Sequence, residues 1–435
     1  MEIHELYEIF LASAGICTDT RKLAPNQLFI ALKGPNFNAN QLAQQALDGG
    51  ACYAIIDDAN FKTNSKMILV EDGLQTLQEL ANHHRNQLKA TIIAVGGSNG
   101  KTTTKELISR VLASTYNTFY TPGNFNNHIG VPLSLLMMTD EHEFGVIEVG
   151  ANHAGEHEIL MEILEPNFGL ITNNGKDHLE GFGSIEGVVV ANAEIYHHLE
   201  ENLKPAFVNG NDHLLMQNAE GMMRLVYSAG QEKPRETLAH VPIQEAQIFP
   251  LVKANIHFSN GASTVVHSHL FGSFQLTNIA VAAAIGYYFD VPIENISASI
   301  SAYKPQNNRT QIVQWKNCDV VLDAYNANPS SLGAMINDFM QYDRPQKVLI
   351  MGDMLELGEH SFAEHNSICQ LANQGNFEQV ICIGRCFLEH KSEFDFQFFE
   401  TRDEAALFLE KTLKPMSTLL IKGSRGLALE KLLES

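Results

Sequence analysis

Short apolar runs rich in β-branched residues recur along this chain, and most of them are followed by longer segments whose apolar positions repeat with helical spacing. This alternation predicts parallel strands covered by helices, so the expected fold class is α/β. The strands are expected at residues 27–32, 53–56, 67–70, 91–95, 145–149, 169–172, 205–208, 224–228, 320–323, 347–351, 379–383 and 418–422.

The pattern changes twice along the chain, which predicts three domains. Residues 1–88 mix short strands with helical segments and are expected to form a small substrate-binding domain. Residues 89–303 predict a central P-loop domain, a parallel sheet with flanking helices. The alternation restarts after the polar stretch at 305–308, so residues 304–435 predict a C-terminal Rossmann-like domain. At 435 residues the chain is long enough for domains that each bury a core.

A phosphate-binding loop is the clearest chemical motif. The segment TIIAVGGSNGKTTTKE at residues 91–106 places glycines and a Lys-Thr pair between an expected strand and an expected helix. Glycines let the backbone direct N–H groups at an anion, the lysine adds charge near the β- and γ-phosphates, and the threonine hydroxyl can bind Mg²⁺. Val95 stands where the longer motif has its first glycine, and the alternative is an accidental turn. The flanking elements favour nucleotide binding, through Gly97, Ser98, Asn99, Gly100, Lys101, Thr102 and Thr103.

Two residues at expected strand ends are candidate metal ligands beside this loop. Glu148 ends the strand at 145–149, and His178 follows the strand at 169–172. Ligands in open α/β sheets bind beyond the carboxyl ends of the strands, and MgATP requires metal ligands there. The alternatives are a buried, hydrogen-bonded carboxylate for Glu148 and a solvated loop histidine for His178.

Polar loops supply candidate substrate contacts. TPGNFNNHIGVP at 121–132 contains Asn124, Asn126 and Asn127, and DAYNANPSS at 323–331 contains Asp323, Asn326 and Asn328. MGDMLELGEHS and IKGSRGLALEKL repeat the order of strand, glycine-containing loop and helix, which favours a second-substrate site over structural turns alone. Arg309, just after the linker, could reach the nucleotide only when the C-terminal domain closes, and the alternative is an ordinary surface arginine.

The composition excludes some classes of binding partner and indicates the cellular compartment of the protein. The chain has 29 Lys and Arg against 50 Asp and Glu, a net charge of −21, which argues against nucleic acid or an anionic membrane as main partner. Six scattered cysteines lack zinc-site spacing and are interpreted as free, mostly buried thiols. The N-terminus lacks signal-peptide order, and the longest apolar run, 279–289, is too short to span a bilayer. A soluble cytoplasmic protein is expected.

In this order, the motifs resemble the Mur ligases of peptidoglycan precursor synthesis, over nearly the whole chain. The resembling blocks are CTDTRKLAPNQLFIALKG, GGSNGKTTTKE, PGNFNNHIGVPLSLL, IEVGANHAGE, NNGKDHLEGFGS, DAYNANPSS, GDMLELG and KGSR. The first block, DAYNANPSS and GDMLELG favour the member that joins D-alanyl-D-alanine to UDP-N-acetylmuramoyl-tripeptide over the amino-acid-adding members and over folylpolyglutamate synthetase.

The resemblance implies an ATP- and Mg²⁺-dependent ligase that works as a monomer and forms an acyl phosphate. It implies catalytic roles for Lys101, His178 and Arg309, and metal ligands at Thr102, Glu148 and His178. It also implies nucleotide contacts at Asn278, Arg309 and Asp323, and substrate contacts at Thr20, Arg21, Asn124, Asn126, Asn127, Asn326 and Asn328. Because the P-loop and Arg309 belong to different expected domains, ligands should draw these domains together.

The chain departs from the family pattern at several positions. Asn192 stands where these ligases usually have a lysine that CO₂ converts to a carbamate near the second metal ion. A neutral amide cannot replace that charge, so fewer charges hold the ion, another group compensates, or activity is reduced; Lys176 is one group to consider. Asn308 replaces a glycine before Arg309, the usual His-Asn before Asn278 is absent, and residues 37–40 read Phe-Asn-Ala-Asn instead of Phe-Asp-Gly-His.

Two other functions are each compatible with one feature of the sequence. Asn192 alone would suit a catalytically weakened protein that binds nucleotide and cell-wall precursors. The P-loop alone would suit a small-molecule kinase, which would leave the C-terminal domain without a role.

Overall fold

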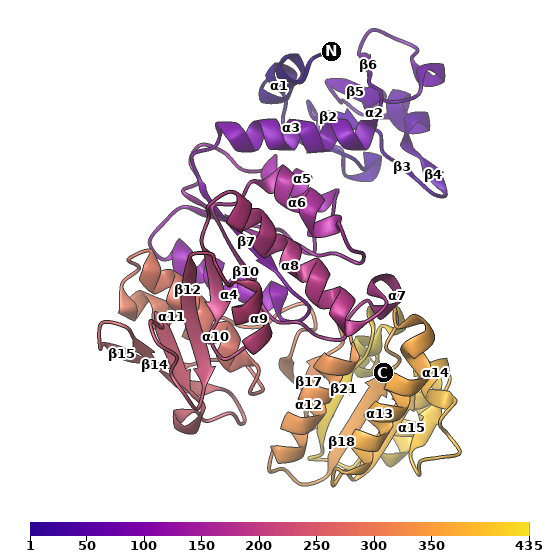
Figure 1. The fold of residues 1–435 in the computed structure, drawn as a ribbon. Coiled ribbons are helices and arrows are strands. Elements are labelled where there is room, and N and C mark those ends of the chain that lie inside the picture. Colours follow the sequence, from indigo (N-terminus) through magenta and orange to yellow (C-terminus); the bar gives the residue numbers. More distant parts are fainter. Residues whose placement is uncertain (435) are drawn as a thin grey trace.

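The computed structural model describes residues 1–434, and its strands form three main sheets that follow one another along the chain (Figure 1). The α/β class predicted from the alternating pattern is confirmed. All twelve predicted strands are present, with ends that differ by no more than two residues. The predicted domain boundaries at 88/89 and 303/304 stay a prediction.

The first sheet is small and parallel, with the strand order β1-β2-β5-β6. Its strands are β1 (Ile16–Cys17), β2 (Leu28–Ile30), β5 (Tyr53–Ile56) and β6 (Met67–Leu69), and a hairpin of β3 (Lys33–Gly34) and β4 (Phe37–Asn38) lies beside it. The helices of this part are α1 (Ile3–Leu11), α2 (Ala43–Asp48) and α3 (Gly73–Gln87).

Helix α3 joins the first sheet to the next part of the molecule. It begins directly after Asp72, because the side chain of this residue accepts a hydrogen bond from the Gln75 N–H. The buried side chain of Leu77 belongs to one hydrophobic core with Ile55 of the first sheet and with Leu160 of the central helices. The two parts therefore share a continuous core, and Figure 1 shows α3 lying between them.

The central sheet has nine strands in the order β15-β14-β13-β12-β11-β10-β7-β9-β8. They are β7 (Thr91–Gly96), β8 (Thr118–Tyr120), β9 (Phe144–Glu148), β10 (Phe168–Ile171), β11 (Ala206–Asn209), β12 (Arg224–Gly230), β13 (Ala239–Pro242), β14 (Lys253–Phe258) and β15 (Ser263–His267). Pairing is parallel from β8 to β13 and antiparallel for β13–β14 and β14–β15. The prediction of a parallel sheet therefore holds from β8 to β13, and the antiparallel strands β14 and β15 at this edge were not predicted.

Helices cover both faces of the central sheet, because its strands are apolar on both sides. Ile92 and Ala94 of β7 face one core with the helices α5 (Gly130–Leu135), α6 (Glu156–Leu164), α8 (Ile185–Glu201) and α9 (His213–Asn218). Ile93 and Val95 face the other core, which holds α4 (Lys101–Ala113), α10 (Gln275–Tyr288) and α11 (Ile293–Ala302). A single turn of helix, α7 (Leu179–Phe182), precedes α8.

The third sheet has the order β16-β17-β21-β18-β19-β20 and is parallel except for the β16–β17 pair. Its strands are β16 (Gln311–Trp315), β17 (Cys318–Asp323), β18 (Lys347–Gly352), β19 (Gln379–Ile383), β20 (Gln397–Phe399) and β21 (Thr418–Lys422). The helices α12 (Pro329–Gln341), α13 (Ser361–Asn373), α14 (Arg385–Leu388) and α15 (Arg402–Thr412) cover its two faces, as predicted for a Rossmann-like domain.

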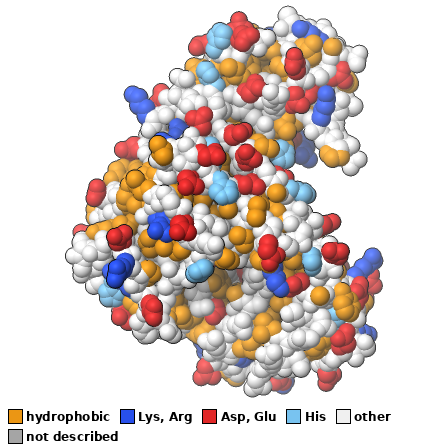
Figure 2. All heavy atoms as spheres, in the orientation of Figure 1, with side chains coloured by type: hydrophobic (Ala, Val, Ile, Leu, Met, Phe, Trp, Pro, Cys, Tyr) orange, Lys and Arg blue, Asp and Glu red, His pale blue; other side chains and the backbone are white. Residues whose placement is uncertain are grey.

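Surface and thiol features agree with the composition. Figure 2 shows acidic side chains spread over the visible face of all three parts, with fewer basic ones between them. All six cysteines are free, and four of them are buried. Within residues 1–434, no helix combines the length and the apolar character needed to cross a membrane.

Candidate functional site

The loop between β7 and α4 has the backbone of an anion-binding turn. Gly97 has φ 111° and Gly100 has φ 83°, both in the left-handed region that favours glycine. A Cβ on Gly97 would lie 2.4 Å from the Thr172 hydroxyl oxygen, so the loop also needs glycine for space. Helix α4 starts after Gly100 without a side-chain cap, which leaves its first N–H groups free to meet an anion.

The lysine and threonine of the loop lie where the motif requires them. Lys101 folds back, and its Nζ donates to the carbonyl of Ser98 at 3.1 Å and to that of Gly97. The Thr102 hydroxyl donates to Oε2 of Glu148 at 2.9 Å. These two oxygens meet because β7 pairs with β9 and brings Val95 opposite Glu148. A hydroxyl and a carboxylate in contact beside a phosphate loop fit a magnesium site.

Glu148 is buried, and each of its oxygens has a partner. Its Oε1 accepts from Nδ2 of Asn126 at 2.9 Å, and the Lys105 Nζ lies 3.7 Å from its Oε2. Lys105 and Glu148 have side chains only 1% and 2% exposed. Sequence reasoning missed Lys105, whose one signal was its position a single helical turn after Lys101 on α4.

His178 lies at the end of the loop that follows β10 and has φ 46°, a left-handed conformation. Its Nδ1 lies 2.7 Å from Oε2 of Glu356, a residue that follows β18. The hydrogen bond from this imidazole holds the pKa of Glu356 below its ordinary value. The imidazole is therefore oriented from the third sheet, and its Nε2 makes no hydrogen bond with any part of residues 1–434.

The loops of the third sheet contribute the opposite wall. Oδ2 of Asp323 accepts from the Lys422 Nζ at 2.6 Å, and the same ammonium donates to the Asn326 carbonyl at 2.9 Å. The Arg309 guanidinium lies over the Tyr325 ring, 3.6 Å from its centre, so Arg309 is held in place by a cation–π contact. Sequence reasoning missed Lys422 and Tyr325.

A direct contact joins the P-loop to this wall. Asn328 caps α12 through its Oδ1, and its Nδ2 donates to Oδ1 of Asn99 at 2.8 Å. The Lys176 N–H donates to the Ser330 hydroxyl at 2.8 Å beside it. The two walls therefore touch in this structure.

Together these walls enclose a cavity of about 490 Å³. Most of the predicted site residues line it: Ser98, Asn99, Gly100, Lys101, Thr102, Thr103, Asn124, Asn126, Asn127, Glu148, His178, Asn278, Arg309, Asp323, Asn326 and Asn328. Gly97 shapes the loop from behind, where its nearest neighbour is Thr172. Thr20 and Arg21 lie instead on the first sheet's edge, where Arg21 pairs with Asp19 at 2.8 Å and has a side chain 86% exposed.

Asn192 and Lys176 bear on the main departure from the family pattern, and Asn278 is a position at which that pattern is kept. Asn192, on α8, donates from Nδ2 to Oδ1 of Asn174 at 2.9 Å and is 4% exposed. Asn278, on α10, accepts from the Thr104 hydroxyl at 3.0 Å and lies against Gly100. Lys176 does not take the place of the missing lysine, because its Nζ pairs with Glu364 at 2.6 Å.

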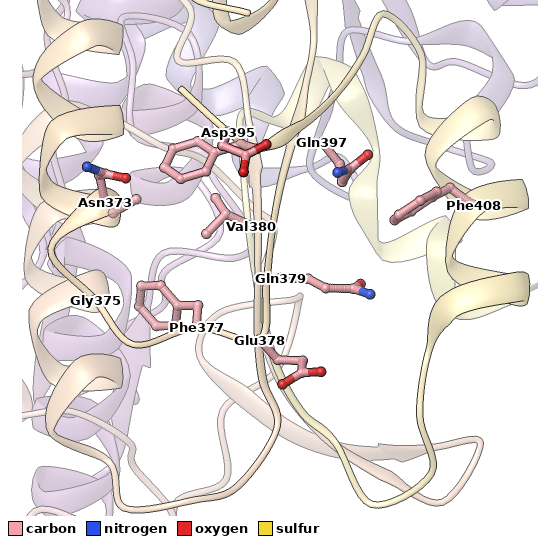
Figure 3. A pocket seen from close by; sticks show the side chains of 11 residues that line it. Asn373, Gly375, Phe377, Glu378, Gln379, Val380, Asp395, Gln397 and Phe408 are labelled. Carbon is pink, nitrogen blue, oxygen red and sulfur yellow. The ribbon is translucent and has the colours of Figure 1, made fainter. Parts of the chain in front are cut away.

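A second, smaller cavity of about 250 Å³ lies within the third part of the chain (Figure 3). Its walls come from the end of α13, from β19 and β20, and from Phe408 of α15. None of the predicted site residues lines it, so the chemistry is assigned to the larger cavity.

Comparisons with known proteins identify the family of this chain. A family model of the Mur ligase middle domain matches residues 95–286, and a model of the Mur ligase, glutamate ligase domain matches residues 308–425. The UDP-N-acetylmuramoyl-tripeptide–D-alanyl-D-alanine ligase of Bacillus subtilis (strain 168) is 31% identical, over 97% of this chain and 92% of its own length. The ligase of the same name from Escherichia coli (strain K12) is 33% identical, over 97% and 93%.

Solved structures that resemble this chain over nearly its whole length are also Mur ligases. A crystal structure of MurF from Acinetobacter baumannii superposes with a TM-score of 0.86 at 28% identity, covering 98% of this chain and 97% of that one. The MurF ligase of Thermotoga maritima in complex with ADP has a TM-score of 0.85 at 25% identity, with the same coverage.

Proposed function

Because the chain belongs to the Mur ligase family, we propose that its cavity joins D-alanyl-D-alanine to UDP-N-acetylmuramoyl-tripeptide at the expense of ATP. The observation that carries this function is the match to ligases of that printed name over 92% and 93% of their own lengths. The family predicted from the sequence motifs is confirmed. None of these relatives supports a weakened precursor-binding protein or a small-molecule kinase.

The nucleotide binds at the P-loop. Backbone N–H groups at the start of α4 receive the phosphates, and Lys101 leaves the loop carbonyls to pair with them. Arg309, held over Tyr325, and the Lys422–Asp323 pair face the same space from the opposite wall. Asn278 lies behind Gly100, where the nucleotide base is expected.

Activation of the peptide is the difficult step, because a carboxylate has a poor leaving group and is repelled by the γ-phosphate. Transfer of the phosphoryl group gives an acyl phosphate, and the amine of the dipeptide then displaces phosphate. Magnesium at Thr102 and Glu148, and a second ion on the His178 side, would neutralise charge on the two anions. Preorganised contacts of this kind typically contribute about 10²–10³ in rate each.

Glu148 is suited to hold a cation because it is kept in one position. Lys105 and Asn126 hold the carboxylate in place, and Thr102 shares one of its oxygens. Correct placement of the reactants can be worth effective molarities of roughly 10⁵–10⁸ M.

The incoming dipeptide binds in the C-terminal wall, near Asn326 and Asn328. The nucleotide-sugar end of the other substrate extends toward Thr20 and Arg21, and Asn124, Asn126 and Asn127 line its path to the P-loop. Nucleotide and substrate stabilise the contact between the two walls. We propose a cytoplasmic monomer that acts without nucleic acid or membrane.

The test is a coupled assay with ATP, Mg²⁺, the UDP-linked tripeptide and the dipeptide. Phosphate should appear only when both acceptors are present, and hydroxylamine should trap an acyl phosphate when the dipeptide is withheld. Phosphate release that does not depend on the dipeptide would contradict the proposal. Small-angle scattering should show compaction when ligands are added, because they draw the two walls together, and an unchanged profile would contradict this.

A further inference from the structure

Three carboxylates line the large cavity, and they differ in their partners. Glu148 is matched by Lys105, and Asp323 by Lys422 at 2.6 Å. Asp177 has no cationic partner in the part of the chain that the structure describes. A buried carboxylate without a cation is costly unless something positive meets it.

Asp177 is enclosed at the cavity wall. It is 7% exposed, and its Oδ1 is buried without a hydrogen-bond partner among residues 1–434. It lies in the loop between β10 and α7, directly before His178, and the tight turn is closed by its N–H, which donates to the Gly175 carbonyl at 2.9 Å. An unpaired carboxylate oxygen and the Nε2 of His178 therefore belong to neighbouring residues on one wall.

The neighbouring amides supply no charge. Asn192 donates to Asn174, and Nδ2 of Asn174 is itself buried without a partner among the described residues. The lysines that line the cavity, Lys101 and Lys422, are directed at the P-loop carbonyls and at Asp323. No lysine lies at the Asn192 position to take up CO₂, so a carbamate cannot form there and any negative charge on this side comes from another residue.

We propose that Asp177 supplies this charge and, with His178, holds the second divalent cation, so that the site works without a carbamate. This inference rests on the proposed ligase function, in which a second cation lies near the peptide carboxylate. Carboxylate oxygen is the ligand that Mg²⁺ and Mn²⁺ prefer, and an imidazole nitrogen is accepted by Mn²⁺. Asn192 is then a neutral support for the loop through Asn174.

The experiment counts bound Mn²⁺ by electron paramagnetic resonance, with full-length protein and an equimolar non-hydrolysable ATP analogue. The unmodified protein should bind two ions per chain, with an affinity that does not change when bicarbonate and CO₂ are removed. Asp177→Asn should weaken one of the two ions at least about 10-fold. Glu148→Gln is the matched control and should weaken the other ion.

Two further variants separate charge from structure. Asp177→Glu keeps the charge and should keep both ions, and the exchange Asp177→Asn with Asn192→Asp should restore the second ion. Two tightly held ions in Asp177→Asn, or a second ion that needs bicarbonate, would overturn the proposal. Loss of the ion in both the Asn and the Glu variants would assign Asp177 a purely structural role and would also overturn it.

The ion count is independent of peptide synthesis. Should the Asp177→Asn variant lose the ion while the unmodified protein makes no product, the cation site stands and the proposed function fails. Should product form while the ion count is unaffected by Asp177, the function stands and this inference fails.

Discussion

The P-loop side and the His178 side of the cavity are built in opposite ways. On the P-loop side, Thr102, Glu148, Lys105 and Asn126 are linked by contacts that all come from the central part of the chain. On the His178 side, polar atoms of Thr172, Asn174 and Asp177 are buried without partners among residues 1–434, and the imidazole is oriented from the third sheet by Glu356. The P-loop side is therefore held together within the central part, whereas the His178 side keeps polar atoms without partners and depends on the third sheet for the orientation of its imidazole.

Removing the buried charge of Lys105 on the P-loop side should have the largest effect, and this effect is on stability. Lys105→Met leaves Glu148 buried without its cation and should lower the free energy of unfolding of the central part by about 3–5 kcal/mol. Urea unfolding followed by circular dichroism measures this. The fluorescence of Trp315, the one tryptophan, reports on the third sheet and should move less.

Two controls make this prediction sharper. Lys204→Met, at an exposed lysine, should change stability by less than about 0.5 kcal/mol. The double variant Lys105→Met with Glu148→Gln should recover most of the loss, because it removes the unpaired charge. An unchanged unfolding curve for Lys105→Met would mean that the buried pair contributes nothing.

Removing the charge of Lys101 on the P-loop side should have the second-largest effect, and this effect is on the reaction rate. Lys101→Ala should lower kcat by about 10²–10³, or about 3–4 kcal/mol of transition-state stabilisation, with little change in thermal stability. Lys101→Arg tests position against charge, because the guanidinium keeps the charge but not the compact shape of the ammonium. Pentapeptide formation at the normal rate by the alanine variant would refute the P-loop assignment.

The stability of the fold should depend on pH through His157. The Nδ1 of this buried residue of α6 donates to the Ala191 carbonyl at 3.0 Å, next to Asn192. Burial, opposed by that hydrogen bond and aided by the nearby charge of Lys101, lowers the pKa of His157 to about 4. Only the unfolded chain then takes up a proton below about pH 6.5.

Protonation of His157 in the unfolded chain alone makes the fold less stable as the pH falls. His157 stabilises the fold fully above about pH 6.5, and this contribution is lost as the pH falls from 6.5 toward 4, in total by about 3 kcal/mol. His157→Gln cannot titrate, so the difference in unfolding free energy between it and the unmodified protein should change by that amount over the window. Parallel pH profiles for the two proteins would show that the imidazole is not buried as described.

Loss of the hydrogen bond between Asn328 and Asn99, which joins the two walls of the cavity, should have the smallest effect, and this effect is on KM. Asn328→Asp keeps the cap of α12 but replaces the amide that donates to Asn99, and it should cost about 1 kcal/mol in the coupling between the walls. It should raise KM for the dipeptide more than it lowers kcat. The matched variant Asn326→Asp, whose carbonyl rather than side chain meets Lys422, should leave the wall contact intact.

Local patterns predicted much of this molecule. The P-loop, the strand ends at Glu148 and Asp323, and the asparagine loops were recognisable because each depends on neighbouring residues. The strands β14 and β15 were missed because they alternate between buried and exposed positions and have no continuous apolar run. A half-solvated antiparallel edge gives a weaker signal than a strand buried on both faces.

The side-chain pairs of the cavity, both ionic and hydrogen-bonded, could not have been predicted from local patterns. Lys422 and Asp323 are 99 positions apart, Lys105 and Glu148 are 43 apart, and Asn99 and Asn328 are 229 apart. Their partners are decided by which strand ends become neighbours in the folded sheets. Asp177 was overlooked for a related reason, since a carboxylate beside a loop histidine carries no signal until its burial is known.

The apolar side of α7 links the His178 loop to the third part of the molecule. Leu179 and Phe182, both on this helix, pack into the core of the third sheet, so the loop that carries His178 is attached to the third part. A movement of the third part relative to the central sheet would therefore displace His178 and leave the P-loop in place. In the proposed ligase, His178 would face the nucleotide only while the two parts remain in contact.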